Sequence, residues 1–382
     1  MMLTLLDQRS KFAGDGGSSL SQANKEAPET MRMRQGWRAA AVAIAAVAVL
    51  SSAGITATLA SASGRTTSSI QAGRTLSVGV QESFNMLPIF VALRNNYFKG
   101  SDITGVKFII FTSLPSMFAA ISQGQLDVGL QTISGINAFN NATSASKLSV
   151  VAPVALGGLN WAVLNGSPIP TATTKDWKTT VMAFKGMKIG VPAAGGILDL
   201  YTRYLASQVG LTYGSDYTTV PVGVGPPAVA ALQNHLVDVI TGDSLNAAQL
   251  IDQKIGHTVL DLGQNQGPSS LSQSLSGVYF TSQSAIQNDP ALFKSFSDGL
   301  AKARAFMGKP TNKKSILDLL TRKVGLTSGE ANYLYDTQVS KSYATVTLNQ
   351  NVFSQTVAAY VAAGALPAPG PSYTDIIAPF AH

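Results

Sequence analysis

Two stretches of this chain resemble each other at one fixed offset of 111 residues. LSVGV at Leu76–Val80 corresponds to MKIGV at Met187–Val191, and AAISQGQLDV at Ala119–Val128 corresponds to AALQNHLVDV at Ala230–Val239. Each copy has the pattern of a strand, a helix, a second strand, a helix that begins at proline, and a short strand that opens with aspartate. A chance repeat is the alternative, but separate blocks share the one offset. The repeat therefore predicts two α/β lobes, and small ligands bind preferentially between such domains.

The order of the expected elements assigns the rest of the chain. Leu148–Ala155 is expected as a further strand of lobe one and Trp161–Asn165 as the crossover segment. A polar stretch at 167–180 then marks a boundary, and a Gln-, Ser- and Gly-rich stretch at 263–276 is typical of a return crossing. From Pro290 onward the pattern is mainly helical. We therefore expect residues 74–166 and 268–382 to form lobe one, 167–267 to form lobe two, and 63–73 to be a linker.

The first 62 residues have the pattern of a leader with an export signal. Basic residues precede an apolar run at Ala39–Leu50, and the small residues at 60–62 match a cleavage site of the A-x-A type. Translation is then expected to start at Met31 or Met33. The alternative is an uncleaved membrane anchor at Ala39–Ala60. Both interpretations place the body of the protein outside the cytoplasm, in the periplasm.

Composition excludes several classes of function. The chain has no cysteine, which rules out disulfides, thiolate metal sites and a cysteine nucleophile. Charged residues make up 12% of the chain and its net charge is +7, without the dense basic stripe of a nucleic-acid-binding protein. The three histidines lack metal-ligand spacing, and neither a Gly-x-Ser-x-Gly elbow nor a carboxylate pair suggests catalysis. We therefore expect a protein that is not an enzyme and needs neither a metal nor a cofactor.

The alternation of strands and helices predicts where a ligand lies. It is typical of parallel sheets, in which ligands bind beyond the carboxyl ends of the strands. The 111-residue offset maps each such loop of lobe one onto a loop of lobe two. The candidate ligand-binding residues are therefore Ser83, Phe84, Asn85, Thr112, Ser113, Leu114, Thr132 and Ser134 in lobe one, and Ala194, Gly195, Gly196, Ile197, Gly225 and Asp243 in lobe two.

Lys188–Leu205, KIGVPAAGGILDLYTRYL, combines a strand, a turn of small residues and a helix. The first N–H groups of a helix have no internal partner and carry part of the helix dipole. Gly195 and Gly196 would let a carboxylate, sulfonate or phosphate approach these groups. The alternative is a tight turn that needs glycine for its geometry alone. The segment has neither the Walker nor the dinucleotide-binding glycine spacing, and its place at a strand end favours anion binding.

Polar side chains at the strand ends have two interpretations. The hydroxyls of lobe one could donate to a ligand oxygen, or each could cap its own helix or turn. Asp243 occupies the position that Thr132 has in the other copy of the repeat. Its carboxylate could accept a hydrogen bond from a ligand amine or from a backbone N–H group of the hinge, and the structural role is favoured.

Several of these motifs resemble those of the solute-binding proteins of ATP-driven importers. The resemblance is to the nitrate/sulfonate/taurine-binding group, which shares a superfamily with the thiamine-pyrimidine-binding proteins. It is carried by LSVGV, ISQGQLDVGL (Ile121–Leu130), KGMKIGVPAAGG (Lys185–Gly196) and VPVGVGPPAVAALQNHLVDV (Val220–Val239), and it covers roughly residues 73–305. It implies an α/β protein of the type II periplasmic-binding-protein fold, with two doubly wound lobes, a hinge and a central ligand cleft.

The resemblance also implies a function. A receptor of this group, expected as a monomer, captures a small molecule between its lobes and delivers it to an ABC permease and ATPase in the inner membrane. The Gly195–Gly196 turn favours an acidic organic ligand of the sulfonate or carboxylate type. The turn lacks the hydroxyl common in the group and the loops lack an arginine, which favours a larger organic acid over a small sulfonate or nitrate. Two alternatives stay open: a ligand-sensing module for a membrane kinase or chemoreceptor, and a binder of a neutral or cationic pyrimidine-like ligand.

Overall fold

The chain divides into two units, Met1–Ala62 and Ser63–His382. The computed structural model describes residues 73–80, 84–111, 113–143 and 146–382, all of which belong to the second unit. The expected leader, start sites and membrane anchor lie outside the described residues, as does the expected linker apart from Gly73. No helix among the described residues combines the length and the apolar character that crossing a membrane requires.

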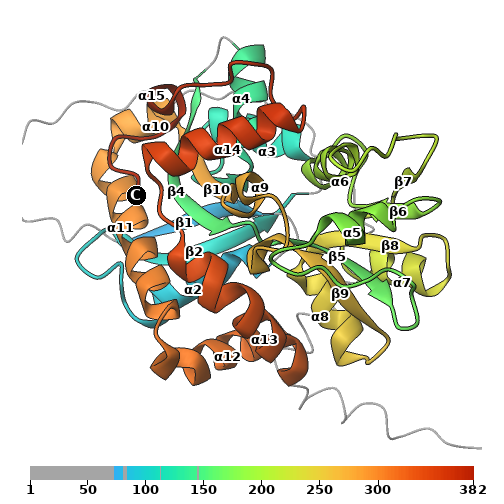
Figure 1. Ribbon diagram of the computed structural model, residues 1–382. Coiled ribbons are helices and arrows are strands. Elements are labelled where there is room, and N and C mark those ends of the chain that lie inside the picture. Colours follow the sequence, from blue (N-terminus) through green and yellow to red (C-terminus); the bar gives the residue numbers. More distant parts are fainter. Residues whose placement is uncertain (1–72, 81–83, 112, 144–145) are drawn as a thin grey trace, which may run out of the picture. The chain divides into compact units, whose positions relative to one another are not determined.

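The strands of the described chain form two sheets of five (Figure 1). The first sheet has the order β2-β1-β3-β10-β4, and the second has the order β7-β6-β8-β5-β9. The strands are β1 (Arg74–Val80), β2 (Ile103–Ile110), β3 (Val128–Gln131), β4 (Leu148–Leu156), β5 (Leu159–Leu164), β6 (Lys188–Val191), β7 (Thr218–Pro221), β8 (Val239–Asp243), β9 (Gly256–Asp261) and β10 (Leu275–Ser282). The matching order confirms the two similar α/β halves that the repeat predicts.

Helices connect the strands and cover the sheets. They are α2 (Leu87–Arg94), α3 (Leu114–Ser122), α4 (Ile133–Ala142), α5 (Lys178–Met182), α6 (Ile197–Ser207), α7 (Pro226–Gln233), α8 (Ser244–Asp252), α9 (Ser269–Ser272), α10 (Gln283–Asn288), α11 (Pro290–Met307), α12 (Lys313–Arg322), α13 (Ser328–Leu334), α14 (Gln350–Ala362) and α15 (Tyr373–Ile376). Short 3-10 segments lie at Phe84–Met86, Leu262–Gln264 and Pro310–Asn312, and a π-helix, η4, spans Tyr335–Tyr343. Proline occupies the first turn of α3, α7 and α11, where its missing N–H has no cost.

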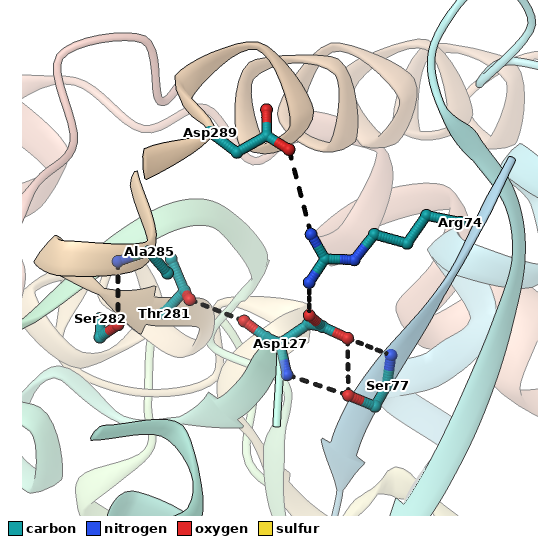
Figure 2. A network of polar contacts seen from close by, with 7 residues as sticks. All are labelled: Arg74, Ser77, Asp127, Thr281, Ser282, Ala285 and Asp289. Atoms are coloured by element: carbon teal, nitrogen blue, oxygen red, sulfur yellow. Dashed lines mark hydrogen bonds and ion pairs between the residues drawn. The ribbon is translucent and has the colours of Figure 1, made fainter. Parts of the chain in front are cut away.

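One aspartate holds the same backbone position in each half of the repeat. Asp127 accepts hydrogen bonds from the backbone N–H and the hydroxyl of Ser77, both at 2.7 Å (Figure 2). Asp238, which is 111 residues further on, accepts from the backbone N–H of Lys188 at 2.8 Å. In the first half, Arg74 adds an ion pair with the same carboxylate. The aspartate that opens each short strand therefore ties β3 to β1 and β8 to β6.

Two chain crossings join the sheets and form the hinge segments. The first runs from Leu156 to Leu159 through Gly157 and Gly158, which both have a left-handed backbone. The second runs from Asp261 to Leu275. The crossings touch, because the Gly157 N–H donates to the Ser274 carbonyl at 2.9 Å. A side chain at Gly157 would also lie only 3.0 Å from the Leu262 backbone, so glycine is needed there.

Strand pairing differs from the expected lobe boundary. β5 pairs antiparallel with β8 and β9 in the second sheet, so the first crossing precedes β5 and does not lie at residue 167. β10 likewise pairs antiparallel with β3 and β4 in the first sheet. Each sheet therefore contains one strand that runs against its neighbour, which alternation of strands and helices does not predict. The reason is that each crossing delivers its strand from the opposite half.

Segments after β10 contact both sheets. α11 packs on α2 and β4, and α14 packs on β10 and α9. α13 packs against α8 of the second half, where the hydroxyls of Tyr333 and Thr258 lie 2.7 Å apart. The C-terminal helices therefore pack on the first half and also contact the second half.

Candidate ligand-binding site

The loops expected to bind a ligand do leave each sheet at a common edge. Val80 at the end of β1 pairs in parallel with Ile110 at the end of β2, and Gly79 pairs with Gly129 on β3. The second sheet repeats this, since Val191 pairs with Pro221 and Gly190 with Ile240. The loops after β1, β2 and β3, and those after β6, β7 and β8, therefore start side by side in each half.

Among the predicted residues that the structure describes, Asn85 is held by two residues far along the chain. It lies in the 3-10 turn after β1, and its carbonyl accepts a hydrogen bond from the Tyr279 hydroxyl at 2.6 Å. Its side-chain oxygen accepts from the Tyr343 hydroxyl at the end of η4. Both tyrosines are buried. The 3-10 turn at Phe84–Met86 is thus held by β10 and by the C-terminal segment.

Tyr343 links this loop to the second sheet. Burial, and after it the neighbouring Asp243 and Tyr279, raise the pKa of the Tyr343 hydroxyl well above its usual value. The charge of Asp243 therefore acts on the hydroxyl that donates to Asn85. Tyr343 is therefore joined to Asn85 by a hydrogen bond and is affected by the charge of Asp243 at the end of β8.

Asp243 ends β8 and caps the N-terminus of α8. One of its carboxylate oxygens accepts from the Leu245 N–H at 3.2 Å, which is a structural role as a helix cap. Burial nevertheless raises its pKa to about 6. The described residues place no cationic group among the causes of this shift. A half-buried carboxylate without a counter-charge is a candidate partner for a hydrogen-bond donor on a ligand.

The turn before α6 has its own carboxylate. Gly195 has the left-handed backbone that the turn needs, and its N–H donates to Asp199 at 2.7 Å. Asp199 is fully buried, and Arg203 pairs with both of its oxygens at 2.9 and 2.8 Å. Gly196 is the N-cap of α6 and donates its N–H to Ala193. An internal anion therefore already occupies part of the position expected for a ligand anion.

Most other predicted residues serve their own elements. Thr132 caps α4 by accepting from the Gly135 N–H at 3.3 Å, and its hydroxyl lies 3.0 Å from that of Ser134. Ser113 precedes α3 and is exposed, without a capping bond to that helix. The Gly225 N–H donates to the Asn246 side chain at 2.9 Å. Ala194 is exposed, Leu114 and Ile197 are half-buried, and Phe84 begins its 3-10 turn. Ser83 and Thr112 lie outside the described residues.

A pocket of about 390 Å³ lies at the crossings and contains none of the predicted residues. It is lined by Leu156, Gly263, Gln264, Asn265, Ser272, Gln273, Ser340, Lys341, Ser342 and Thr345. Its walls are the second crossing and η4, and Lys341 donates across it to the Gln264 side chain. The pocket therefore lies beside the hinge, and one of its lining residues, Ser342, directly precedes Tyr343 in the sequence.

Tyr279 and Tyr343 are the site residues that sequence reasoning missed. Tyr279 lies on β10, a strand that follows the return crossing and was not expected. Tyr343 lies at the end of η4, in the part of the chain for which the sequence predicts only a mainly helical pattern. The repeat gave no signal for either residue, because both belong to the part of the chain outside the two copies.

Comparison with known proteins places the fold. Residues 71–321 match the NMT1-like family. A search of curated proteins finds no match. The periplasmic nitrate-binding protein NrtA from Synechocystis PCC 6803 is 14% identical, with a TM-score of 0.62, over 78% of this chain and 83% of that one. The alkanesulfonate-binding protein SsuA from Xanthomonas axonopodis pv. citri, bound to MOPS, is 16% identical, with a TM-score of 0.58, over 81% and 98%.

A third solved structure agrees. The ligand-binding component of an ABC-type import system from Staphylococcus aureus, with zinc bound, is 13% identical, with a TM-score of 0.61, over 80% of this chain and 97% of that one. All three are named for ligand binding or import and none as an enzyme. These likenesses confirm the expected α/β fold of periplasmic binding proteins.

Proposed function

The chain belongs to the NMT1-like family, and from this premise we propose that it is an extracytoplasmic solute-binding receptor. It captures a small molecule between its two halves and delivers it to an ABC permease and its ATPase. The observation that supports the proposal is that Tyr343 donates to Asn85 and is affected by the charge of Asp243, because these two residues follow β1 and end β8, at the sheet edges where a ligand is expected. The receptor works as a monomer, in the periplasm.

The ligand lies beyond the ends of β1 and β8 in this proposal. The Asn85 carboxamide and the Asp243 carboxylate would contact it from opposite sheets. The half-buried Ile197 and Leu114 would line the same space with apolar surface. Closure of the two halves about the Gly157–Gly158 crossing would then remove the bound molecule from water, which strengthens each polar contact.

The charges favour a ligand that carries hydrogen-bond donors. Asp243 has no cationic partner in the described chain, and an amine or amino-heterocycle would supply one. The Gly195 N–H is engaged by Asp199, so an anion there would meet a carboxylate held by Arg203. The neutral or cationic alternative of the sequence analysis is therefore the first candidate for the ligand.

An acidic organic molecule is the second candidate. The folds of NrtA and SsuA, which are named for nitrate and alkanesulfonate binding, favour it. The N–H groups of Ile197 and Leu198, in the first turn of α6, would be its donors, since the first N–H groups of a helix have no partner within the helix.

A thermal-shift screen of the unit Ser63–His382 tests the proposal. The panel contains amines, aminopyrimidines, carboxylic acids, alkyl sulfonates and nitrate. Only the folded site binds, so a true ligand raises the melting temperature with its concentration. Asp243→Asn is the test variant, and Asp252→Asn, an exposed acid at the other end of α8, is the matched control. A hit that is lost only in Asp243→Asn supports the proposal, and the absence of any hit across all classes contradicts it.

A further inference from the structure

The hinge contains a buried acid–amide pair. Asp261 ends β9 at the start of the second crossing and is 2% exposed. Gln338, in the middle of η4, is fully buried. Its amide nitrogen Nε2 lies 3.3 Å from Oδ1 and 3.4 Å from Oδ2 of Asp261. This pair joins the last strand of the second sheet to the C-terminal segment.

The polar atoms of this pair are only partly satisfied by hydrogen bonds. Both Nε2 contacts are long, and Oδ1 is also engaged by the Gly263 N–H at 2.8 Å. Gln338 Oε1 has no hydrogen-bond partner among the described residues. An orphan buried acceptor is costly, and the group that would satisfy it is a donor on the neighbouring acid. An ionised carboxylate accepts only, whereas a protonated carboxyl group carries one O–H donor.

The surroundings of Asp261 favour its protonated form. Burial raises the pKa of the Asp261 carboxyl group to about 7, against the lowering effect of the Gly263 N–H, Gln338 and Lys341. The titratable groups that face it are Lys341 on η4 and Tyr333 on α13. The Lys341 ammonium also donates to the Gln264 side chain, so it is not a dedicated counter-ion of the acid.

We propose that Asp261 and Gln338 form a proton-operated latch on the hinge. When Asp261 is protonated, its O–H donates to Gln338 Oε1 while Gln338 Nε2 donates back, and the reciprocal pair fastens β9 to η4. When Asp261 loses its proton, the Oε1 acceptor is left without a partner beside a buried charge, and the hinge loosens. The proton goes to and comes from solvent, and no bond other than hydrogen bonds changes.

The latch would regulate closure of the two halves, so it rests on the proposed receptor function. Its effect is a narrower range of distances between the halves at acidic pH than at alkaline pH. Binding need not be measured to see this, so failure of the latch and failure of the receptor proposal are separate outcomes.

The absence of cysteine permits a direct test on the full chain. Lys99→Cys and Asn234→Cys place one spin label on an exposed residue of each half. Pulsed EPR then gives the distance distribution between the labels from about pH 8.5 to about pH 5.5, a range that brackets the titration of Asp261. The variants are Asp261→Asn, which can donate to Oε1 at every pH, and Gln338→Met, which removes the amide. Asp102→Asn, an exposed acid, is the matched control.

The expected result is a distribution that narrows on acidification in the parent and in Asp102→Asn. In Asp261→Asn it should be narrow throughout, and in Gln338→Met it should stay broad. Titration of the Asp261 carboxyl carbon by NMR, which needs no variant, should give the same midpoint as the narrowing. A parent distribution that does not change with pH, or a change that survives in both Asp261→Asn and Gln338→Met, overturns the latch.

Discussion

Asp199 accepts a hydrogen bond from the N–H of Gly195 at 2.7 Å, at the turn where the sequence predicts an external anion. The helix that begins there carries its own acid in its first turn, and Arg203 one turn later neutralises it. The positive end of the helix dipole is thus partly compensated from within. The helix start that most resembles an anion site is therefore a poor indicator of ligand charge in this chain.

Asp199→Ala should lower the free energy of unfolding by about 1.5–3 kcal/mol. It removes charge-assisted hydrogen bonds at a fully buried carboxylate and leaves Arg203 without its partner. Lys294→Ala is the matched control, because it removes an exposed i,i+4 ion pair with Asp298 worth about 0.3–0.5 kcal/mol. Urea unfolding monitored by circular dichroism measures both. Equal losses of unfolding free energy in the two variants would show that the buried Asp199 contacts stabilise the fold no more than an exposed ion pair does.

Asp127→Ala and Asp238→Ala should both destabilise the fold, and Asp127→Ala should do so more. Each variant removes the acceptor of a strand N–H, for about 1–3 kcal/mol. Asp127 loses in addition the Ser77 hydroxyl and the ion pair with Arg74 (Figure 2). The comparison is made by chemical denaturation at one pH. A larger loss in Asp238→Ala would contradict this account of the network.

Stability should fall as the pH rises from about 4 to about 7. Asp243 and Asp261 have folded pKa values of about 6 and about 7, both above the value near 3.9 of an unfolded chain. Within this window the folded state binds more protons than the unfolded state, so its stability is full below the window and is lost as the pH rises through it. Asp261→Asn should flatten the upper part of the curve. A melting temperature that rises in the parent between pH 5 and pH 7 would refute the assignment.

Gly157→Ala should destabilise the chain more than Gly166→Ala. Both glycines have a left-handed backbone, so both variants incur the conformational cost. Only Gly157 faces the backbone of Leu262 at 3.0 Å, whereas nothing lies within 4 Å of the site of a Gly166 side chain. The difference between the two melting temperatures isolates the contact between the crossings. Equal melting temperatures for the two variants would mean that the two crossings can move apart at Gly157 with no loss of stability.

The sequence predicts the parts of this fold that repeat. The 111-residue offset, the prolines that begin helices and the aspartates that open short strands together indicate β1–β3 and β6–β8 with their helices. These features recur because the two copies bury equivalent faces of the same elements. β5, β9 and β10 escape prediction because the crossings place them, and pairing across the sheets is a long-range choice that local periodicity does not encode. The strand-end rule likewise finds Asn85 and Asp243 but not Tyr279 or Tyr343, which come from outside the repeat. The Gly195 N–H is engaged by the carboxylate of Asp199, four residues further along the chain. The orientation of that side chain depends on packing, which the sequence pattern does not show.

The central claim is tested most directly by isothermal titration of a ligand that the thermal-shift screen identifies. The measurement compares its affinity for the parent, for Asn85→Ala and for Asp243→Asn. Each variant should weaken binding by about tenfold or more, since a lost hydrogen bond to a charged group is worth about 1.5–3 kcal/mol. Asp252→Asn should bind as the parent does. Unchanged affinity in both Asn85→Ala and Asp243→Asn would contradict a binding site between the ends of β1 and β8.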